Sequence, residues 1–217
     1  TQKLISFINA HCLNIATQDE EYRHILQKNN HIFPDGSGVN LACKMIGHEV
    51  LENVNGTDML PLICQRATVE KKSIFLLGAE EKVALEMKIK LQSQFPNLKI
   101  SGEHHGFFDF EQESDGIIKT INDSQTDILL IGFGTPIQEK WMAKNAAKIN
   151  SKVLIGVGGL FDFYSGRKPR APLFLRKHGL EWCYRFYLEP QRLFKRYIIG
   201  NPLFIWRVLK WKYLSRK

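Results

Sequence analysis

Two hydrophobic patterns alternate along most of the chain: short continuous apolar runs, and segments whose apolar residues recur every four positions. In KSIFLLGAEE, residues 74–77 are all apolar and the run ends at Gly78. Val83, Met87 and Leu91 then follow at intervals of four. A short apolar run bounded by glycine is typical of a buried strand, and a spacing of four is typical of a helix. This segment is therefore predicted to form a strand followed by a helix.

The same strand-and-glycine pattern recurs at three more places. They are residues 128–131 before Gly132, residues 153–157 before Gly158 and Gly159, and LKIS before Gly102. KLISF and HIFP are weaker strand candidates, a helix is expected after Pro136, and VNLACKMIG predicts a helix that ends at Gly47. Buried strands that alternate with helices indicate an α/β fold with a parallel sheet covered on both faces. Ligands bind such folds at the carboxyl ends of the strands, so the glycine clusters mark the expected site.

The glycine clusters do not match the common nucleotide-binding motifs. GFGTPI (residues 132–137) and GVGGLF (residues 156–161) both lack the third glycine of the dinucleotide fingerprint, and the chain contains no Walker loop. A classical NAD enzyme is therefore disfavoured, although a nucleotide can still bind in another way. Tight turns also require glycine for steric reasons alone, which is the alternative explanation for each of these residues.

The composition of the chain is that of an ordinary globular protein, but its charge is unevenly distributed. Its 217 residues, 44% apolar and 24% charged, suit one globular domain with or without an appendage. The four cysteines form no C-x-x-C pair, as expected for a reduced, cytosolic chain. Residues 167–217 hold 14 basic and two acidic residues, whereas residues 1–166 hold 16 basic and 20 acidic residues. We therefore expect an α/β catalytic domain over residues 1–166 and a basic helical appendage over residues 167–217 that meets an anionic surface.

Candidate polar residues follow the apolar strands. Asp35 comes after Ile32 and Phe33 and can act as a base at a strand end, or it can form an Asp-Gly turn with Gly36. Asn9 also follows a short apolar strand, and it can either point its amide into the cleft that Asp35 would face or cap a helix. Glu139 is expected in the first turn of a helix, where it complements the helix dipole. No D-x-D motif is present and the adjacent His104 and His105 converge poorly, so no metal site is predicted.

The C-terminal segment 202–214 interleaves aromatic and aliphatic residues with cations. It is too short to span a bilayer but suits the headgroup region of a membrane, and the alternative is a terminal core helix. The N-terminal TQKLISF lacks the layout of a signal peptide. Nucleic acid would also suit a basic tail, but the recognised binding motifs are missing. A peripheral position on the inner face of the cell membrane is expected, with no nucleic-acid partner.

Several segments together resemble the bacterial WecG/TagA/CpsF glycosyltransferase family. They are PDGSGV, VNGTD, LLGAEE, IGFGTPIQEKW, GVGGLFDFYSGRKPRAP, GLEWCYRFYLEPQRLFKRY and GNP, in this order over essentially the whole chain. The resemblance implies a Rossmann-like α/β domain and an inverting transfer from a UDP-sugar to a polyprenyl-diphosphate-linked saccharide. It implies no metal ion and no cofactor, and the sugar is N-acetylmannosamine or a related one.

The resemblance also implies roles for individual residues. Asp35 becomes the general base, and Arg185 and Arg192 become the groups that stabilise the departing diphosphate. Substrate-binding positions are Asn9, Gly78, Gly132, Gly134, Thr135, Gln138 and Gly158, with a third basic position on Lys195 or Arg196. The chain departs from the family at Phe7, where relatives often have threonine. Two competing functions remain, a non-catalytic nucleotide-binding protein and a basic nucleic-acid-binding protein on the same fold.

Overall fold

A six-stranded sheet in the order β2-β1-β6-β5-β3-β4 organises the chain. The computed structural model describes residues 2–49 and 54–214. The strands are β1 (Lys3–Ile8), β2 (His31–Pro34), β3 (Ser73–Gly78), β4 (Lys99–His104), β5 (Ile128–Gly132) and β6 (Val153–Gly156). The pairs β1·β6, β6·β5, β5·β3 and β3·β4 are all parallel. The α/β class and the strand predictions, including the two weaker ones, are confirmed.

The chain divides into two compact units. Unit 1 comprises Thr1–Ser6, His24–Ile32 and Gly56–Pro169, and unit 2 comprises Phe7–Arg23, Phe33–Asn55 and Arg170–Lys217. The chain passes from one unit to the other within β1 and β2, so two N-terminal stretches group with the C-terminal residues. The functional division expected at residues 166 and 167 stays a prediction, and its ends, Thr1 and residues 215–217, lie outside the described residues.

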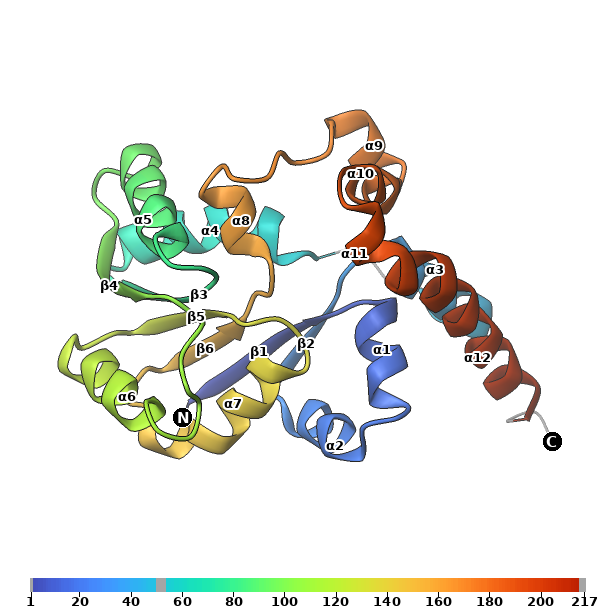
Figure 1. Cartoon of the computed structure of the whole chain (residues 1–217), viewed down its shortest axis with the longest axis horizontal. Helices are drawn as coiled ribbons and strands as arrows, with labels where there is room; N and C mark the ends of the chain where they lie inside the picture. The colour runs from blue at the N-terminus through green and yellow to red at the C-terminus, as the bar shows by residue number, and fades with distance from the viewer. Residues whose placement is uncertain (1, 50–53, 215–217) are drawn as a thin grey trace. The chain divides into compact units, whose positions relative to one another are not determined.

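Unit 1 has helices on both faces of its strands (Figure 1). One face carries α4 (Gly56–Val69), α5 (Val83–Gln94) and α8 (Leu160–Tyr164), and the other carries α6 (Ser114–Asp123) and α7 (Ile137–Asn145), which continues into η1 (Ala146–Lys148). The predicted spacing of α5 is confirmed, because Val83, Met87 and Leu91 are buried on one side of the helix. Such a helix buries its apolar stripe against the sheet and leaves its polar side in water.

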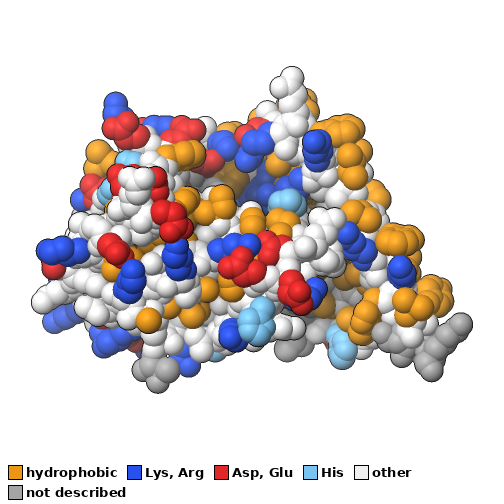
Figure 2. All heavy atoms as spheres, turned by 60° about the horizontal axis from the view of Figure 1, so that its bottom comes forward, with side chains coloured by type: hydrophobic (Ala, Val, Ile, Leu, Met, Phe, Trp, Pro, Cys, Tyr) orange, Lys and Arg blue, Asp and Glu red, His pale blue; other side chains and the backbone are white. Residues whose placement is uncertain are grey.

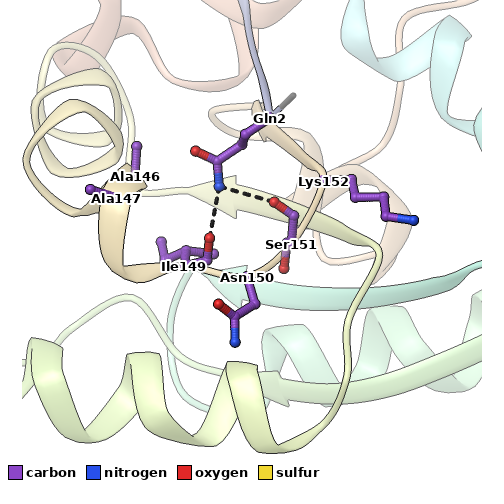
Figure 3. A pocket seen from close by; sticks show the side chains of 7 residues that line it. All are labelled: Gln2, Ala146, Ala147, Ile149, Asn150, Ser151 and Lys152. Atoms are coloured by element: carbon purple, nitrogen blue, oxygen red, sulfur yellow. Dashed lines mark hydrogen bonds between the residues drawn. The ribbon is translucent and has the colours of Figure 1, made fainter.

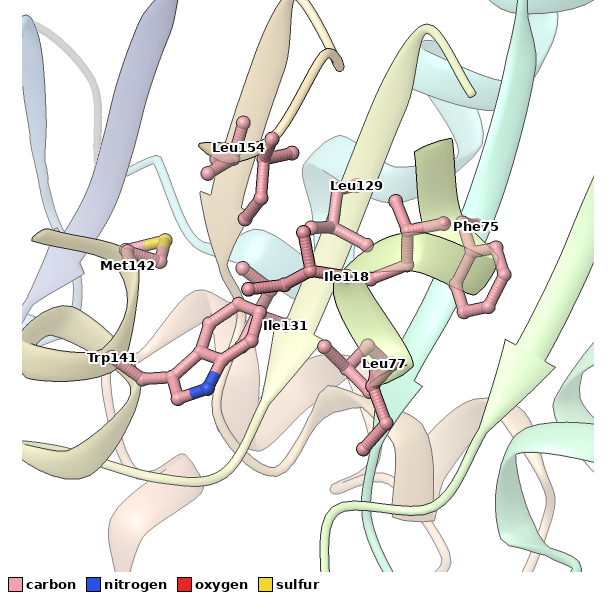
Figure 4. Close-up of a cluster of buried hydrophobic side chains, with 11 residues drawn as sticks. Phe75, Leu77, Ile118, Leu129, Ile131, Trp141, Met142 and Leu154 are labelled. Carbon is pink, nitrogen blue, oxygen red and sulfur yellow. The ribbon is translucent and has the colours of Figure 1, made fainter. Parts of the chain in front are cut away.

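The core of unit 1 lies between the sheet and helices α6 and α7 (Figure 4). Phe75, Leu77 and Leu129 project from the strands toward Ile118 of α6 and Trp141 of α7. All five side chains are buried, with at most 4% of their surface exposed. Burial of each large apolar side chain stabilises the fold by about 1.5–3 kcal/mol, so this cluster fixes the ends of the strands that bear the glycine loops.

The expectation that β4 ends before Gly102 is wrong. The strand continues to His104, and Gly102 pairs with Phe75 inside it, next to a shift in the β3·β4 register. A Cβ on Gly102 would lie 2.5 Å from Cε2 of the Phe75 ring, so glycine makes room for that ring. Glycine inside a strand commonly marks such a close approach. In the sequence it cannot be distinguished from a glycine that ends a strand, because both follow an apolar run.

Unit 2 is built mainly from helices, together with the ends of β1 and β2. Its helices are α1 (Ala10–Ala16), α3 (Ser37–Ile46), α9 (Leu173–Lys177), α10 (Glu181–Leu188), α11 (Pro190–Phe194), the π-helical η2 (Lys195–Ile199) and α12 (Gly200–Leu214), while α2 (Glu20–Lys28) runs from unit 2 into unit 1. The predicted helix ending at Gly47 is confirmed: α3 stops where Gly47 takes a left-handed backbone conformation (φ +88°).

Helix α12 packs on α1 and α3 within unit 2. Phe204 is buried against Ala10 and Ala42. Asn14 joins the helices further, because its Nδ2 donates to the carbonyl of Gly200 (2.7 Å) and its Oδ1 accepts from Arg207 Nη1 (2.7 Å). One face of the C-terminal helix is therefore a core element, as the structural alternative for this segment predicted.

Candidate active site

The predicted site glycines of unit 1 fall into two groups. A Cβ on Gly78 would lie 2.7 Å from Cα of Gly132, and a Cβ on Gly132 would lie 2.7 Å from Cδ2 of Phe161. These two glycines allow close packing at the ends of β3 and β5, which agrees with the steric explanation. Gly134 (φ +83°) and Gly158 (φ +56°) have left-handed backbones and open space where a side chain would begin. The loops after β5 and β6 therefore leave room for a ligand to approach the main chain.

Gln138, in the first turn of α7, links these two loops. Its Oε1 accepts a hydrogen bond from the N–H of Gly158 (2.9 Å), and its Nε2 donates to Oε1 of Glu139 (2.7 Å). Its side chain is 2% exposed, and a Cβ on Gly156 would lie 3.0 Å from its Nε2. Both ends of the amide are therefore engaged by the protein, and its predicted contact with substrate stays a prediction.

Glu139 lies in the first turn of α7, as predicted, but it is not a solvent-exposed charge that merely complements the helix dipole. Its side chain is fully buried and accepts hydrogen bonds from Gln138 and from the hydroxyl of Thr135 (3.3 Å). Burial raises the pKa of the carboxyl, and the hydrogen bonds oppose this shift only in part. Position in the first turn does not show which side of a helix meets the core, so this burial could not be predicted from the sequence.

In unit 2, Asp35 lies directly after β2, and the interpretation of Asn9 as a helix cap is confirmed, whereas its contact with substrate stays a prediction. The backbone N–H of Asp35 donates to the carbonyl of Ile8 (2.7 Å), and the chain then turns at Gly36 (φ +92°) into α3. Asn9 caps α1, because its Oδ1 accepts from the N–H groups of His11 (3.0 Å) and Cys12 (3.2 Å). The Asn9 side chain is also hydrogen-bonded to the Asp35 carboxylate.

Charged residues of the C-terminal helices act on Asp35. Burial is the main cause that raises the pKa of the Asp35 carboxyl, and Glu181 adds to it, whereas Arg185 and Arg196 oppose it. Arg185 is bound to Glu181, whose Oε1 accepts from its Nη2 (2.7 Å) and Nε (3.1 Å). Burial by itself would lower the pKa of Arg185, but Glu181 and other neighbours raise it and keep the guanidinium charged. A carboxylate poised to accept a proton thus lies among groups that can bind phosphate.

Of the predicted basic residues, Arg185 and Arg196 lie in this charged group, where both lower the pKa of Asp35. The Arg192 side chain is 61% exposed and pairs with Glu189, the residue before α11. Lys195 is exposed, whereas Arg196 lies over the ring of Tyr197 at 5.5 Å and its buried Nε has no hydrogen-bond partner among the described residues. The roles of Arg192 and of the third basic position stay predictions.

Two residues of this group were missed from the sequence. Glu181 is four positions before Arg185 and is one of only two acidic residues in the basic tail, a pairing that the sequence displays. His11 is a neighbour of Arg196, and its pKa is lowered by burial and then by that charge. No sequence pattern singles out His11. At Phe7, where threonine is common in the family, the ring is buried beside that of Phe33.

The sequence matches the glycosyl transferase WecG/TagA/CpsF family over residues 1–217. The chain belongs to this family. It is 31% identical over 209 residues to an N-acetylglucosaminyldiphosphoundecaprenol N-acetyl-beta-D-mannosaminyltransferase of Staphylococcus aureus strain MRSA252, covering 96% of this chain and 80% of that protein. A protein of the same name from strain NCTC 8325 is 30% identical over the same share of both chains. This glycosyltransferase is thus an enzyme of the predicted class.

A shallow pocket of this family member lies away from the glycine loops, beside the starts of β1 and β6 (Figure 3). Gln2 spans it and donates from Nε2 to the carbonyls of Ile149 (2.9 Å) and Ser151 (3.0 Å). The pocket has a volume of about 350 Å³ and is lined by Gln2, Ala146, Ala147, Ile149, Asn150, Ser151 and Lys152. None of these lining residues is a predicted site residue.

The described part of this glycosyltransferase contains neither a metal-binding cluster nor a membrane-spanning helix. Residues 2–49 and 54–214 contain no group of three or more His, Cys, Asp or Glu side chains placed to hold a metal ion. His104 and His105 instead contact each other, with ring centroids 4.5 Å apart and His104 Nδ1 2.8 Å from the carbonyl of His105. Over the same residues, no helix has the length and hydrophobicity needed to cross a bilayer.

Proposed function

We propose that this glycosyltransferase moves an N-acetylmannosamine-type sugar from a UDP-sugar to a polyprenyl-diphosphate-linked saccharide during the synthesis of a bacterial cell-surface polysaccharide. The names of the Staphylococcus aureus relatives support this choice of sugar and acceptor. The observation that carries the proposal for this chain is the charged group of Asp35, Arg185 and Arg196 in unit 2. It combines a base with two guanidinium groups, which are the two requirements of transfer from a nucleotide sugar.

In the proposed reaction, the Asp35 carboxylate takes the proton of the acceptor hydroxyl as its oxygen attacks the anomeric carbon. The bond between that carbon and the diphosphate oxygen breaks, and its electron pair leaves with UDP. A single displacement of this kind inverts the configuration at the anomeric carbon. Arg185 and Arg196 stabilise the charge on the departing diphosphate, because guanidinium groups form charge-assisted hydrogen bonds to phosphate oxygens.

The other site residues take supporting roles in this proposal. Asn9 orients the Asp35 carboxylate through the hydrogen bond between them. The loops that contain Gly134, Thr135 and Gly158, with Gln138 between them, keep the substrate-binding role that the family resemblance implies. Gly78 and Gly132 allow the strand ends to pack closely and so shape the same edge of the sheet.

Transfer by the purified full chain tests the proposal. UDP-N-acetylmannosamine and a short-chain polyprenyl-diphosphate N-acetylglucosamine are the substrates, and Asp35→Asn is compared with Asp123→Asn, which removes an exposed carboxylate of α6. Asp35→Asn should lower turnover by about two or more orders of magnitude while UDP still binds in calorimetry. Near-normal turnover in that variant contradicts the assignment of the base.

Metal independence is a separate part of the proposal, and the same assay checks it. Transfer should continue in excess EDTA, because the guanidinium groups supply the positive charge that a metal would otherwise supply. Activity that disappears in EDTA and returns with Mg²⁺ or Mn²⁺ would show that a metal is needed.

We further propose that the chain acts as a peripheral protein on the inner face of the cell membrane. Figure 2 shows hydrophobic and basic side chains together at the end of the molecule that carries α12. Trp206, Trp211 and Leu214 are 56%, 58% and 62% exposed, and Lys210 lies over the ring of Trp206 at 5.2 Å. Exposed tryptophans beside lysines are typical of surfaces that enter the headgroup region of an anionic bilayer.

A further inference from the structure

Glu139 has a carboxyl group that the proposed reaction does not use. It is fully buried in unit 1, and its Oε2 has no hydrogen-bond partner among the described residues. Its Oε1, in contrast, accepts from Gln138 Nε2 (2.7 Å) and from the Thr135 hydroxyl (3.3 Å). A buried acidic side chain with one engaged and one free oxygen needs an explanation, because unpaired polar atoms are costly in the interior.

The contact with Glu139 determines which way the Gln138 amide faces. The N–H of Gly158 donates to the Gln138 amide, and of the two terminal atoms of that amide only Oε1 can accept. When Oε1 faces Gly158, Nε2 must face the other way, where Glu139 Oε1 accepts from it. A reversed amide would set two donors against each other at Gly158 and two acceptors against each other at Glu139. The two contacts therefore select one orientation of the amide.

Building on the proposed function, we propose that Glu139 is a positioning residue of the transferase: its carboxyl oxygen fixes the Gln138 amide and thereby holds the Gly158 loop beside the Gly134 loop. These loops follow β6 and β5 at the edge of the sheet where α/β enzymes bind ligands. Glu139 reaches the Gly158 loop through Gln138, and it also accepts from Thr135 in the Gly134 loop.

The surroundings of Glu139 favour the neutral form. Burial raises the pKa of its carboxyl, and the groups that face it are the Gln138 amide, its own backbone N–H and the Thr135 hydroxyl. Among the described residues, no charged side chain contributes to this shift. Oε1 can accept from Gln138 in either protonation state, provided that any added proton is carried by Oε2.

The test compares Glu139→Gln with Glu139→Met. Glutamine keeps an acceptor oxygen in a side chain of nearly the same shape, so kcat/KM for the UDP-sugar should stay within about threefold of the wild-type value. Methionine fills the same space without an acceptor, so kcat/KM should fall by about 10- to 100-fold, as expected when a positioning contact is lost. Ser114→Ala serves as the matched control. It removes a buried hydrogen bond to Trp141 Nε1 in the same unit and should leave kcat/KM unchanged.

A double-mutant cycle with Gln138→Met shows whether Glu139 acts through Gln138. In the Gln138→Met background, Glu139→Met should cause little further loss, about threefold or less, because the amide that it orients is gone. Full losses that multiply in the double variant would overturn the proposal, and so would a loss in Glu139→Gln as large as that in Glu139→Met.

Two further measurements need no enzyme activity, so they distinguish failure of this inference from failure of the proposed function. The Gly158 amide should exchange its hydrogen at least about tenfold faster in Glu139→Met than in the wild-type protein or Glu139→Gln.

The second measurement is the pH dependence of Tm. Glu139 has a raised pKa in the folded state, so its stabilising contribution is greatest below the unfolded-state pKa and is lost as the pH rises through the folded-state pKa. The Tm of Glu139→Gln relative to the wild type should therefore increase from pH 5 to pH 8. Equal exchange in all variants, or a Tm difference that falls with pH, would overturn the inference even if sugar transfer is confirmed.

Discussion

The two faces of α12 lead to a prediction in which stability and membrane binding separate. Trp206→Ala combined with Trp211→Ala removes exposed rings, whereas Phe204→Ala removes a side chain that is 5% exposed in the core of unit 2. Cutting the chain after Gly200 would be a poor test, because it removes Phe204 and Arg207 together with the exposed rings. Arg207 donates to the carbonyl and side chain of Asn14 at the end of α1.

The size of the membrane effect follows from the exposed surface. A tryptophan buries about 150–250 Å² when it is fully enclosed. With 56% and 58% exposure, each ring offers on the order of 100 Å² to the bilayer, or about 2–3 kcal/mol at about 25 cal/mol per Å². Complete insertion of both rings would strengthen binding by about 10³- to 10⁴-fold. Partial insertion at the level of the headgroups brings the expected loss in the double variant to about 10- to 100-fold.

Sedimentation with vesicles measures this loss, using phosphatidylglycerol vesicles and phosphatidylcholine vesicles as the control. Wild-type binding should require the anionic lipid and weaken as salt is raised, because each cation near an anionic leaflet contributes about 1 kcal/mol. The double variant should keep the wild-type Tm within about 2 °C and transfer sugar normally to a short, water-soluble acceptor. Transfer to a long-chain lipid in vesicles should fall in parallel with binding.

Phe204→Ala should lower the stability of the protein, in contrast to the double tryptophan variant. Removal of a buried phenylalanine costs about 3–5 kcal/mol, which lowers Tm by about 6–20 °C in a chain of this size. If the double tryptophan variant sediments like the wild type, or loses activity equally with both acceptors, then the exposed face of α12 has no role at the membrane. If the tryptophan variant loses as much stability as Phe204→Ala, both faces of α12 are structural.

Three further predictions concern the charged group of unit 2. Because burial raises the pKa of Asp35 and the base must be ionised, kcat/KM should fall with decreasing pH earlier than for an exposed aspartate, and a pH profile without this fall would contradict the assignment. Glu181→Gln should move that fall to lower pH, because the Glu181 charge raises the pKa of Asp35; an unmoved profile would show that Glu181 only holds Arg185. Arg196→Ala should lower transfer by about 10- to 1000-fold and Arg192→Ala by less than about threefold, as measured by kcat at saturating acceptor, and equal losses would refute the choice between them.

Local patterns were sufficient for most of the fold. The strands β3 and β5 were predictable because a continuous apolar run is buried on both faces of a sheet. Helix α5 was predictable because apolar residues four apart lie on one side of a helix, which packs on the sheet. Asp35 could be singled out for the same reason, because a polar residue after an apolar strand lies at the edge where ligands bind. Its assigned role came from the resemblance to the family and remains a proposal.

The pattern could not show which neighbours a side chain finds across the fold. Lys195 and Arg196 are adjacent in sequence and both basic, yet Lys195 is exposed whereas Arg196 is half-buried and lowers the pKa of Asp35. Gly102 follows an apolar run as a strand end would, but it makes room for the Phe75 ring on β3. The burial of Glu139 depends on the packing of α7 against the sheet, which no local pattern shows. The sequence by itself determined where strands and helices form, since that depends on periodicity along the chain. Tertiary structure alone decided burial, and therefore the protonation and partners of the charged residues.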